Sequence, residues 1–235
     1  MDSNSTPEVV EDCFGILKLY TDGAIFRSSE ITHRNPRIHD DGSAVWKDSP
    51  FDINNNLYLR LYKPKSTHSS SGNKLPIICY FHAGGFCFGS RTYPNAHNSC
   101  LSLCSGIGAV VVSADYRLAP ENRLPAALED GGSALKWLRD QALTRVWDEW
   151  LGDVGVDFEK VFVLGDSSGG NMAHHLAVEL GEGSPELAPV RIRGYVLLSP
   201  FFGGTERTKS EEERPHEEFW SQEIYDRFWR LAVPI

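Results

Sequence analysis

The sequence lacks the features by which proteins bind nucleic acid or cross a membrane. Its 23 Lys and Arg residues are outnumbered by 32 Asp and Glu residues, so the formal net charge is −9 at pH 7. An acidic chain repels phosphate backbones, which argues against nucleic acid as a partner. No apolar run approaches the roughly 18 residues that a membrane-spanning helix needs, and the polar, acidic start does not look like a secretory signal. We expect no membrane partner and a cytoplasmic location, with the nucleus as a further compartment.

Cofactor and metal motifs are missing as well. There is no phosphate-binding loop and no Gly-x-Gly-x-x-Gly after a strand, so we expect no nucleotide cofactor. The five cysteines are odd in number, and Cys100 and Cys104 have no further ligand pair at the spacing of a zinc site. Reduced cysteines that pack as small hydrophobic side chains are the simpler interpretation. We therefore expect no metal, while the oligomeric state stays open.

What is present is a chain with two patterns, divided near Leu75. Before it, Asp22-Gly23 between two alternating runs predicts a β-hairpin, preceded by a short helix at residues 7–14. After it, apolar runs alternate with amphipathic stretches, which indicates an α/β fold with a mostly parallel sheet and helices on both faces. Strands are predicted at residues 45–48, 57–62, 76–81, 109–114, 161–164 and 192–198, and helices at residues 95–105, 125–141, 170–180 and 219–233.

The strongest chemical signal is a serine between a predicted strand and a predicted helix. Gly165-Asp166-Ser167-Ser168-Gly169 fits Gly-x-Ser-x-Gly, the pattern of a nucleophile elbow. Gly165 and Gly169 flank the serine because so tight a turn leaves no room for side chains, and Asp166 completes the motif. Ser167 is therefore the candidate catalytic nucleophile, although an ordinary strand-to-helix turn could carry the same five residues.

A serine nucleophile also needs donors for the oxyanion that forms on the substrate. His82-Ala83-Gly84-Gly85 directly follows the first buried strand after Leu75 and is similar to the His-Gly-Gly-Gly oxyanion motif of esterases and lipases. We expect backbone N–H groups of Gly84, Gly85 and Ser168 to form the oxyanion hole. We interpret His82 as a structural hydrogen-bonding residue rather than a catalytic base.

Four motifs in register carry a resemblance to a known family. They resemble the hormone-sensitive-lipase branch of the α/β-hydrolases, and the opening Val-Glu-Asp-Cys-Phe-Gly-Ile-Leu and closing Phe-Trp-Arg-Leu-Ala-Val-Pro resemble plant carboxylesterases, which are relatives of the gibberellin receptors. The motifs are His82–Phe86, Asp115–Glu121, Pro125–Asp130 and Gly165–Asn171. The resemblance implies one α/β-hydrolase domain over residues 1–235, with an N-terminal cap or hairpin at about residues 1–30 and a cap helix within residues 205–235. It also implies a small-molecule ester as substrate, with strigolactone-type lactone esters as one candidate.

Two departures from the family pattern matter. Ala83 stands where the family has glycine; if that position needed a positive φ, its Cβ would cost roughly 1–2 kcal/mol. The order of the triad, Ser then Asp or Glu then His, is not completed after Ser167. His174 and His175 lie about two helical turns further on and point away, and His216 lies in an acidic stretch. We expect an incomplete domain, short by roughly 60–100 residues at about 30 residues per strand-and-crossover unit.

Aromatic residues are the candidates for the substrate pocket, although aromatic side chains near a sheet are more often core. They are Phe86, Phe88, Phe201, Phe202 and Trp229. Two functions stay open at this point: an esterase that uses Ser167, and a binding protein that resembles the gibberellin receptors, which keep the serine without the catalytic histidine. A chain that folds poorly because a parallel strand edge is exposed is a third interpretation.

We predict little or no triad-dependent turnover by these 235 residues, because the sequence offers Ser167 no base at the family's position. An ester-hydrolysis assay checks this prediction. Hydrolysis at a rate usual for the family, abolished by Ser167→Ala, would contradict it.

Overall fold

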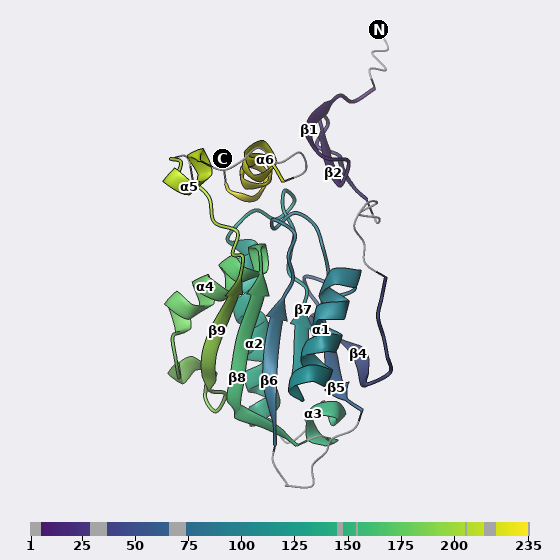
Figure 1. The fold of residues 1–235 in the computed structure, drawn as a ribbon, viewed down its shortest axis with the longest axis vertical. Helices are drawn as coiled ribbons and strands as arrows, with labels where there is room; N and C mark the ends of the chain where they lie inside the picture. Colours follow the sequence, from purple (N-terminus) through teal and green to yellow (C-terminus); the bar gives the residue numbers. More distant parts are fainter. Residues whose placement is uncertain are drawn as a thin grey trace.

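The computed structural model describes residues 6–28, 37–65, 74–144, 148–153, 155–204, 206–213 and 220–234. Within them, a six-stranded sheet has the order β4-β5-β7-β6-β8-β9, and a separate three-stranded sheet has the order β1-β2-β3 (Figure 1). The strands are β1 Val9–Cys13, β2 Leu17–Tyr20, β3 Ile25–Arg27, β4 Ala44–Asp52, β5 Leu57–Pro64, β6 Leu75–Phe81, β7 Val110–Ala114, β8 Val156–Asp166 and β9 Ile192–Leu198. The helices are α1 Pro94–Ile107, α2 Ala126–Leu143, α3 Glu149–Asp153, α4 Ser168–Leu180, the 3₁₀ helix η1 Pro185–Leu187, α5 Lys209–Glu212 and α6 Gln222–Ala232.

The large sheet is parallel where the site lies. β7, β6, β8 and β9 run parallel, while β5 pairs antiparallel with both β4 and β7. The fold class predicted from sequence is confirmed, because the apolar runs form these parallel strands and the amphipathic stretches form the helices beside them. The carboxyl ends of parallel strands meet at one edge of a sheet, so the loops after β6 and β8 are brought together there.

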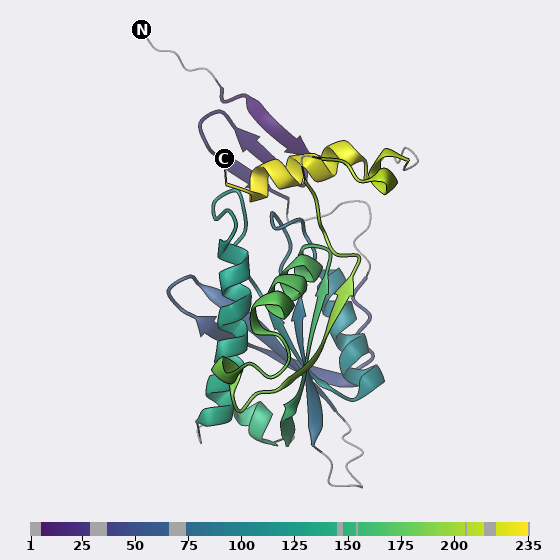
Figure 2. The same ribbon diagram turned by 90° about the vertical axis from the view of Figure 1, so that its left-hand side faces the viewer.

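Helices cover the two faces of the sheet unequally. Figure 2 shows α1 on the opposite side of the sheet from α2. α1 begins with Pro94 at its first position, where no N–H is needed, and ends at Gly108 in the left-handed conformation, with a φ of 70°. On its face, the buried side chains of Ile78, Tyr80 and Leu164 join one apolar cluster with residues of α1.

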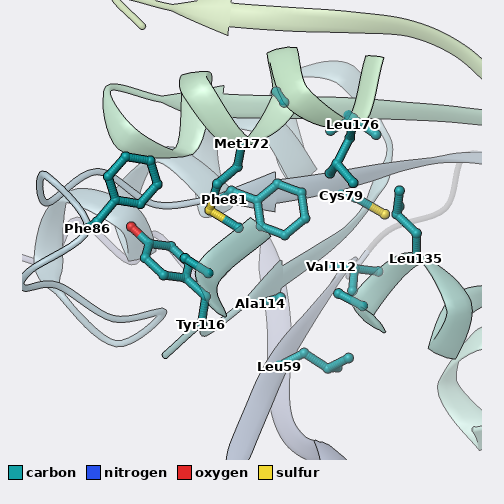
Figure 3. Close-up of a cluster of buried hydrophobic side chains, with 14 of the residues drawn as sticks. Leu59, Cys79, Phe81, Phe86, Val112, Ala114, Tyr116, Leu135, Met172 and Leu176 are labelled. Atoms are coloured by element: carbon teal, nitrogen blue, oxygen red, sulfur yellow. The ribbon is translucent and has the colours of Figure 1, made fainter. Parts of the chain in front are cut away.

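The larger cluster lies on the face covered by α2 and α4. Figure 3 shows Met172 and Leu176 of α4 pointing toward Phe81 of β6, with Leu135 of α2 beside them. The side chains of Leu135, Met172 and Leu176 are fully buried. Alternation along β6 sends Phe81 to this face and Tyr80 to the other. The core therefore holds the ends of β6 and β8, which carry the predicted site.

The small sheet and α6 lie together above the carboxyl ends of the parallel strands (Figures 1 and 2). An Arg227 guanidinium N–H donates to the carbonyl of Asp12 at 2.6 Å, and Arg230 pairs with Glu11 at 2.9 Å. We call β1, β2, β3 and α6 the cap. The hairpin predicted around Asp22-Gly23 is confirmed as β2 and β3.

One predicted element is wrong. Residues 7–14 were expected to be helical, but Val9–Cys13 form β1, which pairs antiparallel with β2. Two consecutive β-branched valines favour an extended chain, and the open edge of the hairpin supplies hydrogen-bond partners that a local sequence pattern does not reveal. The other predicted elements are present with shifted bounds. The helix expected over residues 219–233 is α6, and the part of that prediction at residue 219 lies outside the described residues.

Apolar side chains of β9 and of the neighbouring β8 remain exposed on one face of the sheet. Val196 is 41% and Leu198 47% exposed, and Phe162 on the neighbouring β8 is 36% exposed. These residues lie on the face of α1, which packs toward the other edge of the sheet, against β4, β5 and β7. Among the described residues, no helix combines the length and apolar character needed to cross a membrane.

We predict that Leu176→Ala lowers the free energy of unfolding by about 2–5 kcal/mol, because it leaves a cavity in the fully buried cluster under α4. Val178→Ala on the same helix is the matched control. Its side chain is 75% exposed, so we expect a change of about 0.5 kcal/mol or less. Urea denaturation followed by tryptophan fluorescence measures both, and similar effects would contradict this view of the core.

Candidate active site

Ser167 lies in a strained turn between β8 and α4. Its backbone has a φ of 53° and a ψ of −112°, a conformation that residues with side chains rarely adopt. A Cβ on Gly165 would lie 1.9 Å from the carbonyl oxygen of Gly169, and one on Gly169 would lie 2.1 Å from that of Phe81. Only glycine fits at either position. The N–H of Ser167 donates to the carbonyl of Leu198 at 2.9 Å, which anchors the turn to the end of β9.

The loop after β6 makes a second tight turn beside this serine. Gly84 has a φ of 145°, and a Cβ on it would lie 1.8 Å from the carbonyl oxygen of Phe88. The N–H groups of Cys87 and Phe88 both donate to the carbonyl of Gly84, at 2.9 and 3.1 Å. Gly85 has a φ of 56°, and a Cβ on it would lie 3.0 Å from the ring of Phe228 in the cap. Gly84, Gly85 and Ser167 line one cavity, so the structure brings the predicted nucleophile and these predicted donors together.

Ser168, the third predicted donor, begins α4. Its side chain is fully buried, and its hydroxyl lies 3.1 Å from that of Tyr116. The first N–H groups of a helix have no partner within the helix and carry a partial positive charge. The N–H of Ser168 belongs to this first turn, but Ser168 is not among the residues that line the cavity, so its part in the oxyanion hole stays a prediction.

The strain considered for Ala83 does not arise. Ala83 is not among the residues with positive φ, whereas Phe86, three residues on, has a φ of 64°. The left-handed part of the loop thus begins at Gly84. Position 83 does not need a positive φ, so alanine costs no backbone strain there. The loop therefore needs no displacement to accommodate the methyl group of Ala83.

His82 contacts the backbone of the loop after β6 and the ring of Tyr116. Its Nδ1 lies 2.8 Å from the carbonyl oxygen of Ala83, which can only accept, so Nδ1 carries the proton. The ring stacks on Tyr116 at 4.2 Å, and the Tyr116 hydroxyl donates to the His82 carbonyl at 2.8 Å. Burial lowers the pKa of His82, which keeps the ring neutral. These contacts support the structural role predicted for it.

The other histidines after the serine are not beside it. The ring of His174 packs edge-on against Phe202 at 5.1 Å, and His175 faces Glu179 at 3.4 Å on the outer side of α4. Neither lines the cavity. His216 lies outside the described residues. Of the described residues that line the cavity, His82 is the only histidine and Asp166 the only carboxylate.

The cavity has a volume of about 710 Å³, within the range of small-molecule sites. Of the five aromatic residues expected in it, Phe88 and Phe201 do line it. Phe86 is buried in the core, Trp229 stacks behind Phe201 at 4.8 Å, and Phe202 is 50% exposed. The lining residues are Ile16, Tyr80, His82, Ala83, Gly84, Gly85, Phe88, Gly89, Ser90, Tyr93, Asn95, Ala96, Asn98, Ser99, Asp166, Ser167, Phe201, Trp220, Tyr225 and Phe228.

Comparison with known proteins identifies the family. Residues 78–234 match the family described as the alpha/beta hydrolase fold. A probable carboxylesterase 6 of Arabidopsis thaliana is 37% identical over 99% of this chain and 68% of its own length. A 3-O-acetylpapaveroxine carboxylesterase of Papaver somniferum is 40% identical over 80% of this chain and 61% of its own. This chain belongs to the plant carboxylesterases of the α/β-hydrolase family.

A solved structure agrees with this assignment. A hyperthermophilic esterase from the archaeon Pyrobaculum calidifontis is 31% identical, with a TM-score of 0.64 over 81% of this chain and 56% of that one. The chain thus spans about two thirds of the length of the curated plant relatives that it matches and just over half of the archaeal enzyme.

In this carboxylesterase chain, one residue that sequence reasoning missed connects the cap to the loop of Gly84 and Gly85. Arg27 at the end of β3 donates to the carbonyls of Cys87 and Ala119, both at 2.7 Å, and pairs with Glu121. These partners are 60 to 94 residues away in the chain, so no local pattern indicates them.

The described residues contain no group of histidine, cysteine and acidic side chains that could hold a metal ion.

We predict that Gly165→Ala lowers the free energy of unfolding by about 3 kcal/mol or more, because its Cβ would overlap the backbone of Gly169. The control is Gly132→Ala in α2, where a Cβ meets nothing within 4 Å and alanine favours the helix by up to about 1 kcal/mol. Urea denaturation measures both variants. Equal stability of the two would show that the elbow does not require glycine.

Proposed function

We propose that this site is the nucleophile and oxyanion part of a carboxylic-ester hydrolase that acts on small lipophilic esters. The observation that carries the proposal is the shared position of Ser167, Gly84 and Gly85 on one cavity. Attack by the Ser167 hydroxyl forms a bond to the ester carbonyl carbon and moves an electron pair onto the carbonyl oxygen. The N–H groups of Gly84, Gly85 and Ser168 would hold that oxyanion. Collapse of the intermediate releases the alcohol and leaves an acyl-serine for water to cleave.

The proton of Ser167 needs a base. His82 carries its proton on Nδ1, and its Nε2 is buried without a hydrogen-bond partner among the described residues, so it accepts nothing from Ser167. The other described histidines lie outside the cavity. We infer that the base and acid of the triad are not among the described residues beside Ser167. The described residues alone would therefore acylate slowly.

We assign the cap to closing the cavity over the ester. Tyr225 and Phe228 of α6, with Ile16 between β1 and β2 and Trp220 before α6, line the cavity, which favours lipophilic substrates. The similarity to carboxylesterases supports ester hydrolysis in general. Strigolactone-type lactone esters are a candidate within this class on the family resemblance.

A second candidate function is binding without turnover, as in the hormone receptors that share this fold. It is favoured because neither His82 nor Asp166, the described lining residues that could act as a base, hydrogen-bonds to Ser167, and because aromatic side chains close the cavity. The two functions share a pocket and differ in whether Ser167 reacts.

We predict that an alkyl fluorophosphonate forms a covalent adduct on Ser167, slowly but completely, because the oxyanion donors also stabilise a phosphonyl oxygen. Intact-protein mass spectrometry measures the adduct. Ser167→Ala should abolish it, and the control Ser133→Ala, whose hydroxyl bonds to the carbonyl of Glu129 on exposed α2, should label like the wild type. Tight binding of small lipophilic esters without any adduct would favour the binding protein instead.

A further inference from the structure

The two walls of the cavity differ in chemistry. The wall formed by the cap and by the segment after β9 is apolar and aromatic, whereas the wall formed by the sheet and α1 is polar. The first wall contains Ile16, Phe201, Trp220, Tyr225 and Phe228, and the second contains Tyr80, Asn95, Asn98, Ser99 and Asp166. A ligand that fills the cavity therefore meets mainly rings and aliphatic groups on one side and mainly amide, hydroxyl and carboxylate groups on the other.

The strand register directs Asp166 to the polar wall. Tyr80 of β6 pairs with Leu164 of β8, and both side chains belong to the cluster under α1. Side chains two residues apart on a strand share a face, so Asp166 points to the same side as Leu164. Asp166 is the last residue of β8. It follows Leu164, which is the last residue of β8 in the apolar cluster under α1, and its own side chain lines the cavity.

The carboxylate of Asp166 has no partner among the described residues, since no hydrogen bond or ion pair to it is present there. Three other carboxylates that are buried or half-buried differ from it: Asp48, Asp115 and Asp130 each bind an arginine. Burial raises the pKa of Asp166, as expected for an acid that has lost water without gaining a donor. A donor supplied by a ligand would satisfy it.

Neighbouring polar groups face the same space. Ser99 lies beside the hydroxyl of Tyr80, and Asn95 lies one helical turn before Ser99, on the same side of α1. Asn98 is engaged elsewhere, because its amide binds the backbone of Arg37 and His39 at 2.9 Å. The side chains left to meet a ligand are thus Asp166, Asn95 and the pair Tyr80 and Ser99.

We propose that this polar wall is a substrate subsite for a hydrogen-bond donor, either a hydroxyl group or a protonated amine. The proposal rests on the proposed function for the identity of the reacting group. The substrate is then an ester with a lipophilic group under the cap and a donor on the other side of its carbonyl. Because Asp166 directly precedes Ser167, and neighbouring Cα atoms are about 3.8 Å apart, the donor lies within a few bonds of the scissile carbonyl.

The test measures binding and needs no turnover. The probes are three ketones, which lack a leaving group, that share a 4-phenylbutyl group and carry a 2-hydroxyethyl, a 2-aminoethyl or a propyl group on the other side of the carbonyl. Isothermal titration calorimetry on the 235-residue chain gives their affinities. We expect the hydroxyl or the amine ketone to bind about tenfold tighter than the propyl ketone, the scale of a hydrogen bond to a charged group.

Two variants identify the donor. Asp166→Asn keeps an oxygen acceptor without the charge, and Asp166→Leu removes both. A subsite for an amine loses its preference in both variants, whereas one for a hydroxyl keeps it in Asp166→Asn and loses it in Asp166→Leu. The propyl ketone should bind all variants alike, which shows that the cavity is intact.

The control is Asp157→Asn, because Asp157 lies at the opposite end of β8, where it pairs with Lys160. It should leave all three affinities unchanged. Equal binding of the three ketones to the wild type, no binding by any of them, or a preference that survives Asp166→Leu would overturn the subsite. Failure of the fluorophosphonate to label Ser167 would instead refute ester hydrolysis and leave the donor subsite standing.

Discussion

The close approach of three backbone segments at Ser167 is the constraint on which the site depends. The end of β6, the end of β8 and the start of α4 lie so near one another that Gly165 and Gly169 have no room for a Cβ. Parallel pairing of β6 with β8 brings Phe81 opposite Gly165. The same contact that strains the serine backbone places the loop of Gly84 and Gly85 next to it. Nucleophile and oxyanion donors are thus positioned together by sheet packing.

The cap is tied to this constraint by an arginine that reaches backbone carbonyls. Arg27 binds the loop after β6, whereas Arg227 joins α6 to β1 within the cap by binding the carbonyl of Asp12. A guanidinium group can hold two carbonyls at once because its donors are spread over a rigid plane. The small sheet and α6 also pack into the main apolar cluster, where Leu17, Phe228 and Leu231 are buried. The aromatic residues that they contribute make one wall apolar, and the sheet and α1 make the other polar.

Much of the site follows from local sequence. The Gly-x-Ser-x-Gly motif and the glycines after His82 predicted their own turns, because such backbone conformations leave few other residues possible. The parallel strands were predictable from continuous apolar runs. Local patterns failed where a distant partner decides the outcome. Residues 9–13 became a strand because β2 offers an edge, and Phe86 and Trp229 became core because the cap packs against the loop after β6.

The sequence by itself determined the elbow, the oxyanion loop and the order of strands and helices, since each depends on residues adjacent in the chain. Only the tertiary structure decided which side chains face the cavity. Asp166 was a motif residue in the sequence, and the strand register turns it toward α1 in a part-buried site, where the described residues give its carboxylate no partner. Arg27 and the two walls depend on contacts between segments far apart in the chain. The local sequence pattern cannot predict such contacts. They form, and contribute to stability, only after the sheet has brought the two distant segments together.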